Sequence, residues 1–211
     1  MSKPGKFITF EGGEGSGKST QLKLLCEALA ISHVATREPG GSVGAERIRG
    51  LLVSGDKDAW DAQTETLLFY AARLDHVNKL IKPAIAEGKL VICDRFSDST
   101  RVYQGAGKGL SEEYIGELHR LTLGNFAPDL TIIFDIDPTI GLKRAASRHG
   151  DENRLESMDI DFHHRIRNGF LTIAQNEPGR CVILDAAQDK VVLHGQVLAA
   201  IEQKLGIKTR G

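Results

Sequence analysis

The chain of 211 residues has almost no net charge, few cysteines and no long apolar run, and each of these shortages excludes a class of protein. Its 27 basic and 28 acidic residues nearly cancel, so no overall field attracts it to nucleic acid or to a membrane surface. No apolar run approaches the roughly 20 residues of a membrane-spanning helix, and no signal-peptide core follows Met1. We therefore expect a cytoplasmic protein that binds neither nucleic acid nor membranes.

Cysteine and histidine do not form the patterns of a metal site or a disulfide framework. Cys26, Cys93 and Cys181 lie far apart within apolar segments, which favours reduced thiols in the core. None of the seven histidines has another at i, i+4, and the adjacent His163 and His164 diverge on a helix. These residue types therefore indicate no metal centre.

Short apolar runs alternate along the chain with segments of helical periodicity. The runs are Phe7–Phe10, His33–Thr36, Leu90–Cys93, Leu130–Ile136 and Cys181–Leu184. Because their apolar residues are continuous rather than alternating, they are typical of parallel strands buried on both faces. The length suits one large core, so we expect a single α/β domain over residues 1–211. Charged residues follow each run, where such sheets bind ligands.

A glycine-rich segment follows the first run, with the spacing G-x-x-x-x-G-K-S. This spacing wraps backbone N–H groups around the phosphates of a nucleotide, with Lys18 at the β- and γ-phosphates and the Ser19 hydroxyl on Mg²⁺. The alternative is a glycine-rich turn that only caps a helix. We therefore predict a P-loop, a phosphate-binding loop for a nucleotide, which consists of Gly12, Gly13, Glu14, Gly15, Ser16, Gly17, Lys18, Ser19 and Thr20.

Asp94 and Arg95 close the third apolar run. In a P-loop protein, a carboxylate at the end of a buried strand is well placed to act on Mg²⁺, directly or through water. The adjoining guanidinium can bind a phosphate in a bidentate manner. The alternative is a salt bridge at the end of the strand. Ser19 and Asp94 are therefore the candidate metal ligands.

A possible base-binding pair lies on a helical stretch, where Phe69 and Arg73 are one turn apart. An aromatic ring beside a guanidinium can stack on a planar base and donate hydrogen bonds to its edge. Phe69 could instead be an ordinary core residue.

Taken together, these segments resemble the bacterial thymidylate kinase family over nearly the whole chain. The shared motifs are E-G-x-E-G-x-G-K-S-T, T-R-E-P-G-G, L-L-F-Y-A-A-R, D-R-F-x-D-S-T and Y-Q-G, in the order and spacing of the family. The resemblance implies a P-loop nucleoside-monophosphate kinase fold, with five parallel strands in the order 2-3-1-4-5 flanked by helices and with a helical lid. It also implies that the P-loop residues form an ATP site, that the protein phosphorylates dTMP to dTDP with ATP and Mg²⁺, and that it is a homodimer.

The resemblance assigns roles to residues on both sides of Asp94. For the base, Phe69 would stack on thymine, Arg73 would reach its carbonyl, and Ser99 and Thr100 would read its polar edge, with Gln104 lining the same pocket.

For the sugar and phosphate, Glu14 would lie near the 3′-hydroxyl, Tyr103 would crowd out a ribose 2′-hydroxyl, and Arg95 would hold the dTMP phosphate. Arg37 is a further candidate for this phosphate, and it could equally form a structural ion pair.

The catalytic arginines are expected in a lid at about residues 143–156. Gly15 has no side chain, so a catalytic arginine must come from outside the P-loop, and Arg148 and Arg154 are the predicted source, beside the catalytic Lys18 and Arg95. The family usually has Asp where this chain has Asn153, and Asn cannot neutralise charge. The alternative for these arginines is a solvated helix face.

Other P-loop proteins remain as alternatives. The first is a small kinase that acts on another monophosphate or on a nucleoside. The second is a nucleotide switch, but the chain has no D-x-x-G, and Asn78-Lys79 is followed by Leu80-Ile81 rather than by the x-Asp of guanine recognition. A motor or partitioning ATPase would leave the lid arginines and the segment around Tyr103 unexplained.

Overall fold

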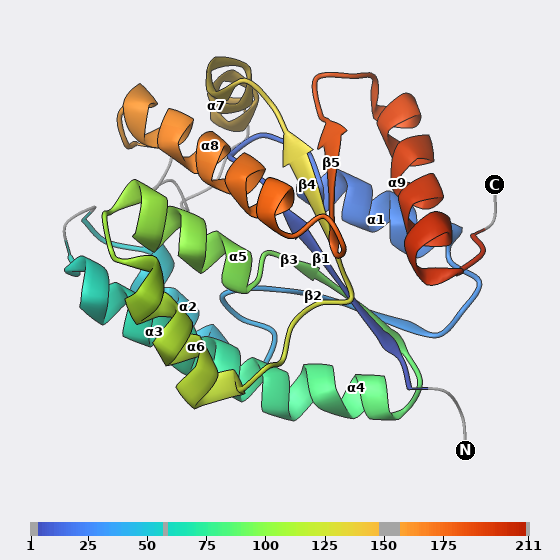
Figure 1. Ribbon diagram of the computed structural model, residues 1–211, viewed down its shortest axis with the longest axis horizontal. Coiled ribbons are helices and arrows are strands. Elements are labelled where there is room, and N and C mark those ends of the chain that lie inside the picture. Colours follow the sequence, from blue (N-terminus) through green and yellow to red (C-terminus); the bar gives the residue numbers. More distant parts are fainter. Residues whose placement is uncertain (1–3, 57–58, 148–156, 210–211) are drawn as a thin grey trace.

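The computed structural model describes residues 4–56, 59–147 and 157–209, and a five-stranded sheet lies at its centre (Figure 1). All neighbouring strands are parallel, and their order is β2-β3-β1-β4-β5. The strands are β1 (Lys6–Glu11), β2 (His33–Arg37), β3 (Leu90–Asp94), β4 (Leu130–Asp135) and β5 (Cys181–Asp185). The predicted α/β class and strand order are confirmed.

Helices and two π-helical segments connect the strands. They are α1 (Lys18–Ala28), α2 (Val43–Val53), α3 (Ala62–His76), η1 (Val77–Ile81), α4 (Lys82–Ala86), α5 (Ser97–Thr100), η2 (Arg101–Gly107), α6 (Glu112–Leu123), α7 (Pro138–Ala146), α8 (Ile160–Asn176) and α9 (Lys190–Leu205). Helices α1 and α9 cover one face of the sheet, and α3, α4, α6 and α8 cover the other (Figure 1). No helix in the described ranges is both long and apolar enough to cross a bilayer.

The central strand β1 is buried on both faces. Ile8 and Phe10 pack in the core beneath α1 and α9, whereas Phe7 packs on the opposite face. The Phe7 ring meets the Phe96 ring edge-to-face at 5.0 Å between centroids. Side chains alternate between the faces of a strand, so a strand covered on both faces needs a continuous apolar run.

The apolar character of the strands stops at one edge of the sheet. Every strand ends in a charged residue: Glu11, Arg37, Asp94, Asp135 and Asp185. Because the strands are parallel, these residues lie along the same edge, where the connecting loops also gather. The fold therefore brings the charged groups of distant sequence segments together.

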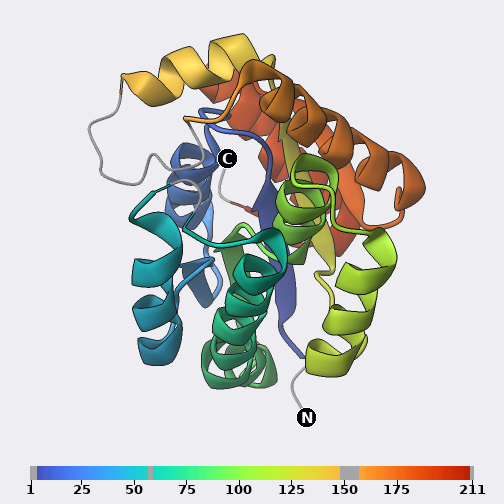
Figure 2. The ribbon, with the colours of Figure 1, turned by 90° about the vertical axis from the view of Figure 1, so that its left-hand side faces the viewer.

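Helices α2, α3 and α6 form one surface of the molecule, in which α3 packs against both α2 and α6 (Figure 2). Large apolar side chains are exposed on all three helices: Val43 and Leu51 on α2, Leu67 on α3 and Leu121 on α6. Leu121 is 72% exposed and Leu67 is 50% exposed. We refer to these four residues as the α3 face.

Candidate functional site

The P-loop joins β1 to α1 and follows a path that only glycine permits at its centre. Gly15 has a φ of 65°, and a Cβ atom there would lie 1.9 Å from the carbonyl oxygen of Gly141 in α7. Gly17 precedes α1 and has no side chain to cap it. The first N–H groups of α1 thus face the loop without a side-chain cap, which is the arrangement that binds anions at helix N-termini.

Lys18 begins α1 and turns back over the loop. Its Nζ donates hydrogen bonds to the carbonyl oxygens of Gly12 at 3.0 Å and Gly13 at 2.8 Å. Burial lowers the pKa of Lys18 to about 8, and the nearby Arg95 charge acts in the same direction. The ammonium group therefore remains charged at neutral pH, but it loses its proton at a lower pH than an exposed lysine does.

Ser19 and Asp94 come together beside this lysine. The Ser19 hydroxyl donates a 2.7 Å hydrogen bond to Asp94 Oδ2, which joins the start of α1 to the end of β3. A hydroxyl oxygen and a carboxylate oxygen are the hard donors that Mg²⁺ prefers, and Mg²⁺ usually takes few protein ligands with substrate phosphates. The residues present therefore fit this ion.

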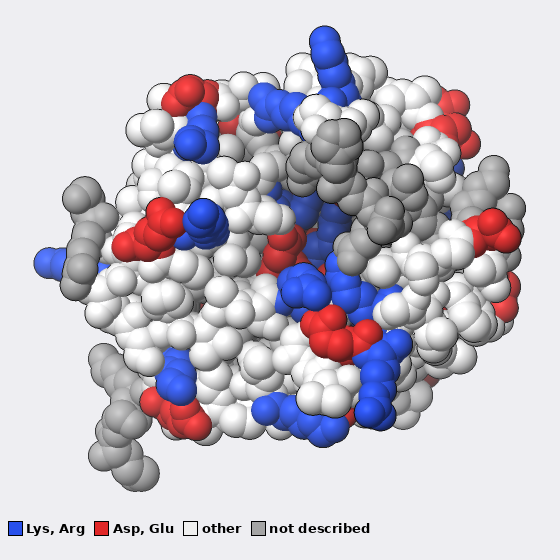
Figure 3. Space-filling model, turned by 180° about the vertical axis from the view of Figure 1, so that it is seen from behind, with Lys and Arg blue, Asp and Glu red and all other residues white. Residues whose placement is uncertain are grey.

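A cavity of about 160 Å³ opens beyond Asp94, bounded by α2, α3, α5, η2 and the P-loop. Figure 3 shows a hollow near the centre of one face, in which basic side chains lie beside acidic ones. All the predicted acceptor residues except Arg37 line the cavity: Glu14, Phe69, Arg73, Arg95, Ser99, Thr100, Tyr103 and Gln104. Glu14 belongs to the P-loop, so the cavity and the predicted ATP site share a wall.

Arg95, Glu14 and Tyr103 form one hydrogen-bonded group at that wall. Glu14 Oε1 accepts hydrogen bonds from Arg95 Nη2 at 2.7 Å and from the Tyr103 hydroxyl at 2.9 Å. Burial raises the pKa of Glu14, but the charges of Arg95 and Lys18 outweigh this effect and lower it to about 2. Arg95 has a positive φ of 70°, uncommon for a residue with a side chain. The wall between the P-loop and the cavity therefore carries an ionised carboxylate, from Glu14, and an ionised guanidinium, from Arg95.

Arg73 lies deeper in the cavity and is almost fully buried, with a side chain 2% exposed. Its Nε donates to Glu38 Oε2 at 2.7 Å, and its Nη2 donates to the Phe96 carbonyl at 3.1 Å and to Thr100 Oγ1 at 3.0 Å. Burial opposes its charge, but Glu38 raises its pKa above the usual value. Nη1 has no hydrogen-bond partner among the described residues. A buried charged donor of this kind suits a ligand with an acceptor atom.

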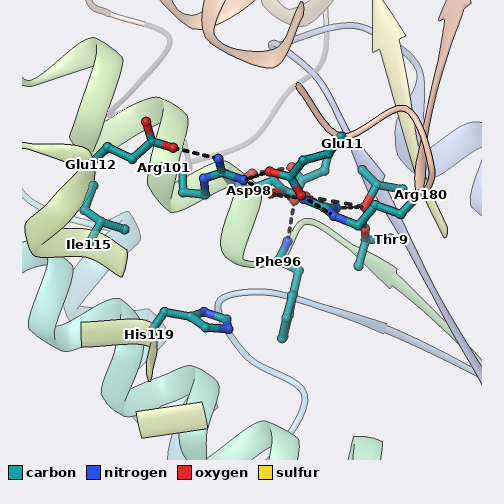
Figure 4. Close-up of polar contacts among 12 residues, drawn as sticks. Thr9, Glu11, Phe96, Asp98, Arg101, Glu112, Ile115, His119 and Arg180 are labelled. Carbon is teal, nitrogen blue, oxygen red and sulfur yellow. Dashed lines mark hydrogen bonds and ion pairs between the residues drawn. The ribbon is translucent and has the colours of Figure 1, made fainter. Parts of the chain in front are cut away.

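The short helix α5, which carries Ser99 and Thr100, is held from behind by buried charges (Figure 4). Asp98 accepts hydrogen bonds from Arg180 at 2.7 and 2.9 Å and from Arg101 at 3.2 Å. These arginines lower the pKa of Asp98 despite its burial. Arg101 also donates to Glu112 on α6 at 2.8 Å, so the neighbouring helices fix α5 in place.

Glu11 at the end of β1 holds the other side of α5 (Figure 4). Its Oε1 accepts from the backbone N–H groups of Phe96 at 2.8 Å and Ser99 at 3.3 Å, and its Oε2 accepts from the Ser99 hydroxyl at 2.6 Å. Burial, followed by the charge of Asp98, raises the pKa of Glu11 to about 7. The central strand thus positions two cavity residues through one carboxyl group.

Of the predicted residues, one lies away from this constellation and others fall outside the described residues. Arg37 lies at the end of the edge strand β2 and pairs with Glu46 at 3.2 Å, with its side chain 54% exposed. It does not line the cavity, and the ion-pair alternative describes its contacts. Arg148 and Arg154 lie outside the described residues, as does Asn153. Arg144, at the start of the expected lid, donates a 2.8 Å hydrogen bond to the carbonyl of Ala186.

The cavity also contains residues that sequence reasoning missed. Glu38 and Arg49 both line it, and Arg49 donates a 2.6 Å hydrogen bond to the carbonyl of Pro39. Glu65 accepts a 2.9 Å hydrogen bond from Gln104 Nε2. Glu38 stands within the motif T-R-E-P-G-G, so its position was visible in the sequence, although its direction was not.

The fold and the site together define a class of protein. A P-loop at the end of the first strand, a parallel sheet in the order 2-3-1-4-5 and an acceptor cavity beyond Asp94 make the chain a P-loop nucleoside-monophosphate kinase. Residues 10–197 match the family described as thymidylate kinase. The chain belongs to the thymidylate kinase family.

Individual relatives agree with this assignment. A thymidylate kinase of Caulobacter vibrioides is 48% identical over 206 residues, which cover 96% of this chain and 99% of the relative. One from Ruegeria pomeroyi is 52% identical over 192 residues, or 90% of each chain. The crystal structure of thymidylate kinase from Ehrlichia chaffeensis has a TM-score of 0.76 and 36% identity, and covers 94% of this chain and 100% of that chain.

Proposed function

We propose that this protein transfers the γ-phosphoryl group of ATP to the phosphate of dTMP, which yields dTDP for dTTP synthesis. The observation that carries the proposal is the common wall of the P-loop and the cavity, in which Glu14 and Arg95 are 2.7 Å apart. A donor on the P-loop and an acceptor in the cavity would meet at this wall with their phosphates adjacent. Such proximity is the main requirement of phosphoryl transfer.

In the acceptor site, the shape and the donors of the cavity suit a thymine nucleotide. Phe69 would stack on the base. Nη1 of Arg73, which has no partner in the described part of the chain, would donate to a base carbonyl. Ser99 and Thr100 would read the polar edge, and Gln104 would line the pocket. The buried ring of Tyr103 would occupy the space of a ribose 2′-hydroxyl, with Glu14 near the 3′-hydroxyl.

In the transfer step, an oxygen of the acceptor phosphate attacks, and no side chain acts as a nucleophile. Arg95 would hold the acceptor phosphate next to Glu14. Lys18 would exchange its contacts with the Gly12 and Gly13 carbonyls for phosphate oxygens of ATP. These two cations would neutralise the charge that spreads over a loose, in-line transition state.

Mg²⁺ belongs to the same proposal, with Ser19 and Asp94 as the residues that would hold it. When bound, this ion would neutralise part of the charge of the phosphates. The other charged groups proposed for the donor side are Arg148 and Arg154 in the lid at about residues 143–156. An arginine at the transition state can contribute roughly 10³-fold or more to turnover.

We further propose a homodimer of single-domain chains that meet through the α3 face. The four exposed apolar side chains of this surface support the proposal, because apolar patches of this kind are used as protein interfaces. The cytoplasmic location expected from the sequence also remains a prediction.

The proposed reaction is tested by an ADP-release assay with ATP and Mg²⁺ across a panel of monophosphates. We expect dTMP to be the best acceptor, ahead of dCMP, dAMP, AMP, CMP and GMP. Lys18→Ala is the control for the P-loop, because it removes the cation and leaves the backbone cradle in place. It should abolish turnover and keep the circular dichroism spectrum of the folded protein. Faster turnover of AMP, CMP or GMP would refute the assignment.

A further inference from the structure

The buried network around Arg73 includes a carboxylate of the cavity wall that the proposed mechanism does not use. Glu38 follows β2, and its side chain is only 3% exposed. Its Oε2 accepts from Arg73 Nε at 2.7 Å, and its Oε1 hydrogen bonds with Nδ1 of His76 at 3.1 Å. One carboxylate therefore bridges two residues of α3 that lie one helical turn apart.

The far end of this network is fixed as well. His76 is fully buried, and its Nε2 hydrogen bonds with Thr36 Oγ1 on β2 at 2.8 Å. A Cβ atom at Gly41 would lie 2.3 Å from the same Nε2, so the Gly41 backbone lies close to the ring. The backbone N–H of Glu38 donates to the Asp94 carbonyl at 2.9 Å. Glu38 is thus held at its backbone and at both carboxylate oxygens.

These contacts leave Arg73 a single orientation. Its guanidinium has five N–H donors in one plane, of which three are used by Glu38, Phe96 and Thr100. The Arg73 guanidinium carbon also lies 4.8 Å from the ring centroid of Tyr70 and 5.3 Å from that of Phe96. The two donors that remain are both on Nη1, whose direction is set once the other three are bound.

We propose that Glu38 is a positioning residue that sets base specificity by fixing Nη1 of Arg73 toward the acceptor base. This inference rests on the proposed function, since it concerns the base of the acceptor nucleotide. Thymine presents a carbonyl oxygen at the position where cytosine presents an amino group. Arginine can only donate hydrogen bonds, so a fixed Nη1 can pair with the carbonyl oxygen of thymine. Opposite cytosine, Nη1 and the amino group are both donors, and both remain unpaired.

The charge of Glu38 alone does not explain its position. A carboxylate that merely neutralised Arg73 would need no second contact. This one also contacts His76, and His76 is held in turn by Thr36. Glu38→Gln keeps the shape and an oxygen for Arg73 Nε, and its amide can pair with the other tautomer of His76. Glu38→Asp keeps the charge but is one methylene too short to bridge Arg73 and His76. The two variants therefore separate orientation from charge.

The experiment measures kcat and KM for dTMP and dCMP, together with the dissociation constant of each by calorimetry. For Glu38→Ala we expect a KM for dTMP raised about tenfold or more and a kcat within about threefold. The preference for dTMP over dCMP should also fall by about tenfold or more. Glu38→Asp should change in the same direction, and Glu38→Gln should restore the preference to within about threefold. Glu117→Gln, from an exposed pair with Arg120 at 3.3 Å, is the control that should match the wild type.

The outcomes are distinct. A purely structural contribution would lower the melting temperature and the active fraction while leaving KM and the base preference unchanged, and that result would overturn the inference. If Glu38→Ala does not fold, Glu38→Asp decides the matter, and a wild-type preference in that variant also overturns it. A wild-type protein without any preference for dTMP overturns the proposed function and this inference together. A wild type that prefers dTMP, with unchanged Glu38 variants, overturns only the inference.

Discussion

Single charged residues at this site depend on their neighbours for their ionisation. Glu14 and Arg95 are 2.7 Å apart, and Lys18 lies close enough for its charge to lower the pKa of Glu14. Because these groups are largely screened from water, each charge changes the proton affinity of the next. The pKa of Glu14 is about 2 and that of Lys18 is about 8. Both groups are therefore charged at neutral pH, and Lys18 is the one close to titration.

We predict that the affinity for ATP is constant up to about pH 8 and falls above it. The free protein then loses the Lys18 proton, whereas bound phosphates favour the charged form, so binding requires proton uptake at high pH. The decline should approach but not exceed about tenfold per pH unit. Calorimetric titration with ATP from pH 6.5 to 9.5 measures it.

The matched variant is Lys18→Arg, whose guanidinium keeps its proton over this range and should give a flat profile if it binds ATP. An equal decline in this variant would show that another group is responsible.

At the level of residues, the sequence predicted which side chains line the cavity when their spacing on a single helix determines the direction in which they point. Phe69 and Arg73 are four apart on α3, and both line the cavity. The sequence could not show which of Arg37 and Arg49 lines the cavity. Arg37 ends an edge strand and reaches solvent, whereas the packing of α2 on α3 turns Arg49 toward the cavity. That choice depends on the rotation of a helix, which local sequence does not determine.

Among the elements, α5 has the least intrinsic stability, since it is four residues long. Isolated helices of this length do not form in water. Asp98 on one side and Glu11 on the other supply its hydrogen bonds and charges. The strands behave differently, because each of their predicted apolar runs is one continuous local signal. Their ends in the structure fall within one residue of the prediction.

We predict that Glu11 makes stability fall as the pH rises from about 5 to 7. Its pKa is raised from 4.5 to about 7 in the folded protein, so over this range the folded state binds more protons than the unfolded chain. Raising the pH therefore lowers the free energy of unfolding. Glu11→Gln cannot titrate at this position. The free energy of unfolding of this variant should therefore rise relative to that of the wild type as the pH increases from 5 to 7.

Urea midpoints at pH 5, 6, 7 and 8 give this comparison. Glu202→Gln, at an exposed position on α9, is the control and should run parallel to the wild type. A wild-type curve parallel to that of Glu11→Gln would contradict the prediction.

On the scale of the whole molecule, the fold arranges an open sheet so that its two faces differ in their surroundings. Helices α1 and α9 cover one face, whereas the α3 face lies on the other side with its apolar residues exposed. The family and the activity were predictable because the motifs occur along nearly the whole chain in one order. The proposed dimer leaves no such linear motif, since the residues of the α3 face come from three separate helices.

We predict that Leu67→Glu combined with Leu121→Glu shifts the protein toward the monomer. Charges at the α3 face would be buried without partners in the dimer, which costs more than the apolar contacts provide. Sedimentation velocity at several protein concentrations measures the shift.

Val191→Glu is the control, because Val191 is 71% exposed on α9 at the opposite face and should leave the dimer intact. A double variant that sediments as the wild type does would exclude the α3 face as the interface.

The direct contact between Gly15 and Gly141 limits how this protein can evolve. An arginine at position 15 would bring its charge straight to the phosphates, but its Cβ would collide with a backbone oxygen. At position 141, a Cβ would lie 2.4 Å from the Glu14 carbonyl oxygen, so neither glycine can make room for a change in the other. No single substitution, and no pair confined to these two sites, opens a route to an arginine within the loop. Any lineage with this backbone must therefore place an arginine that reaches the phosphates on a segment outside the loop.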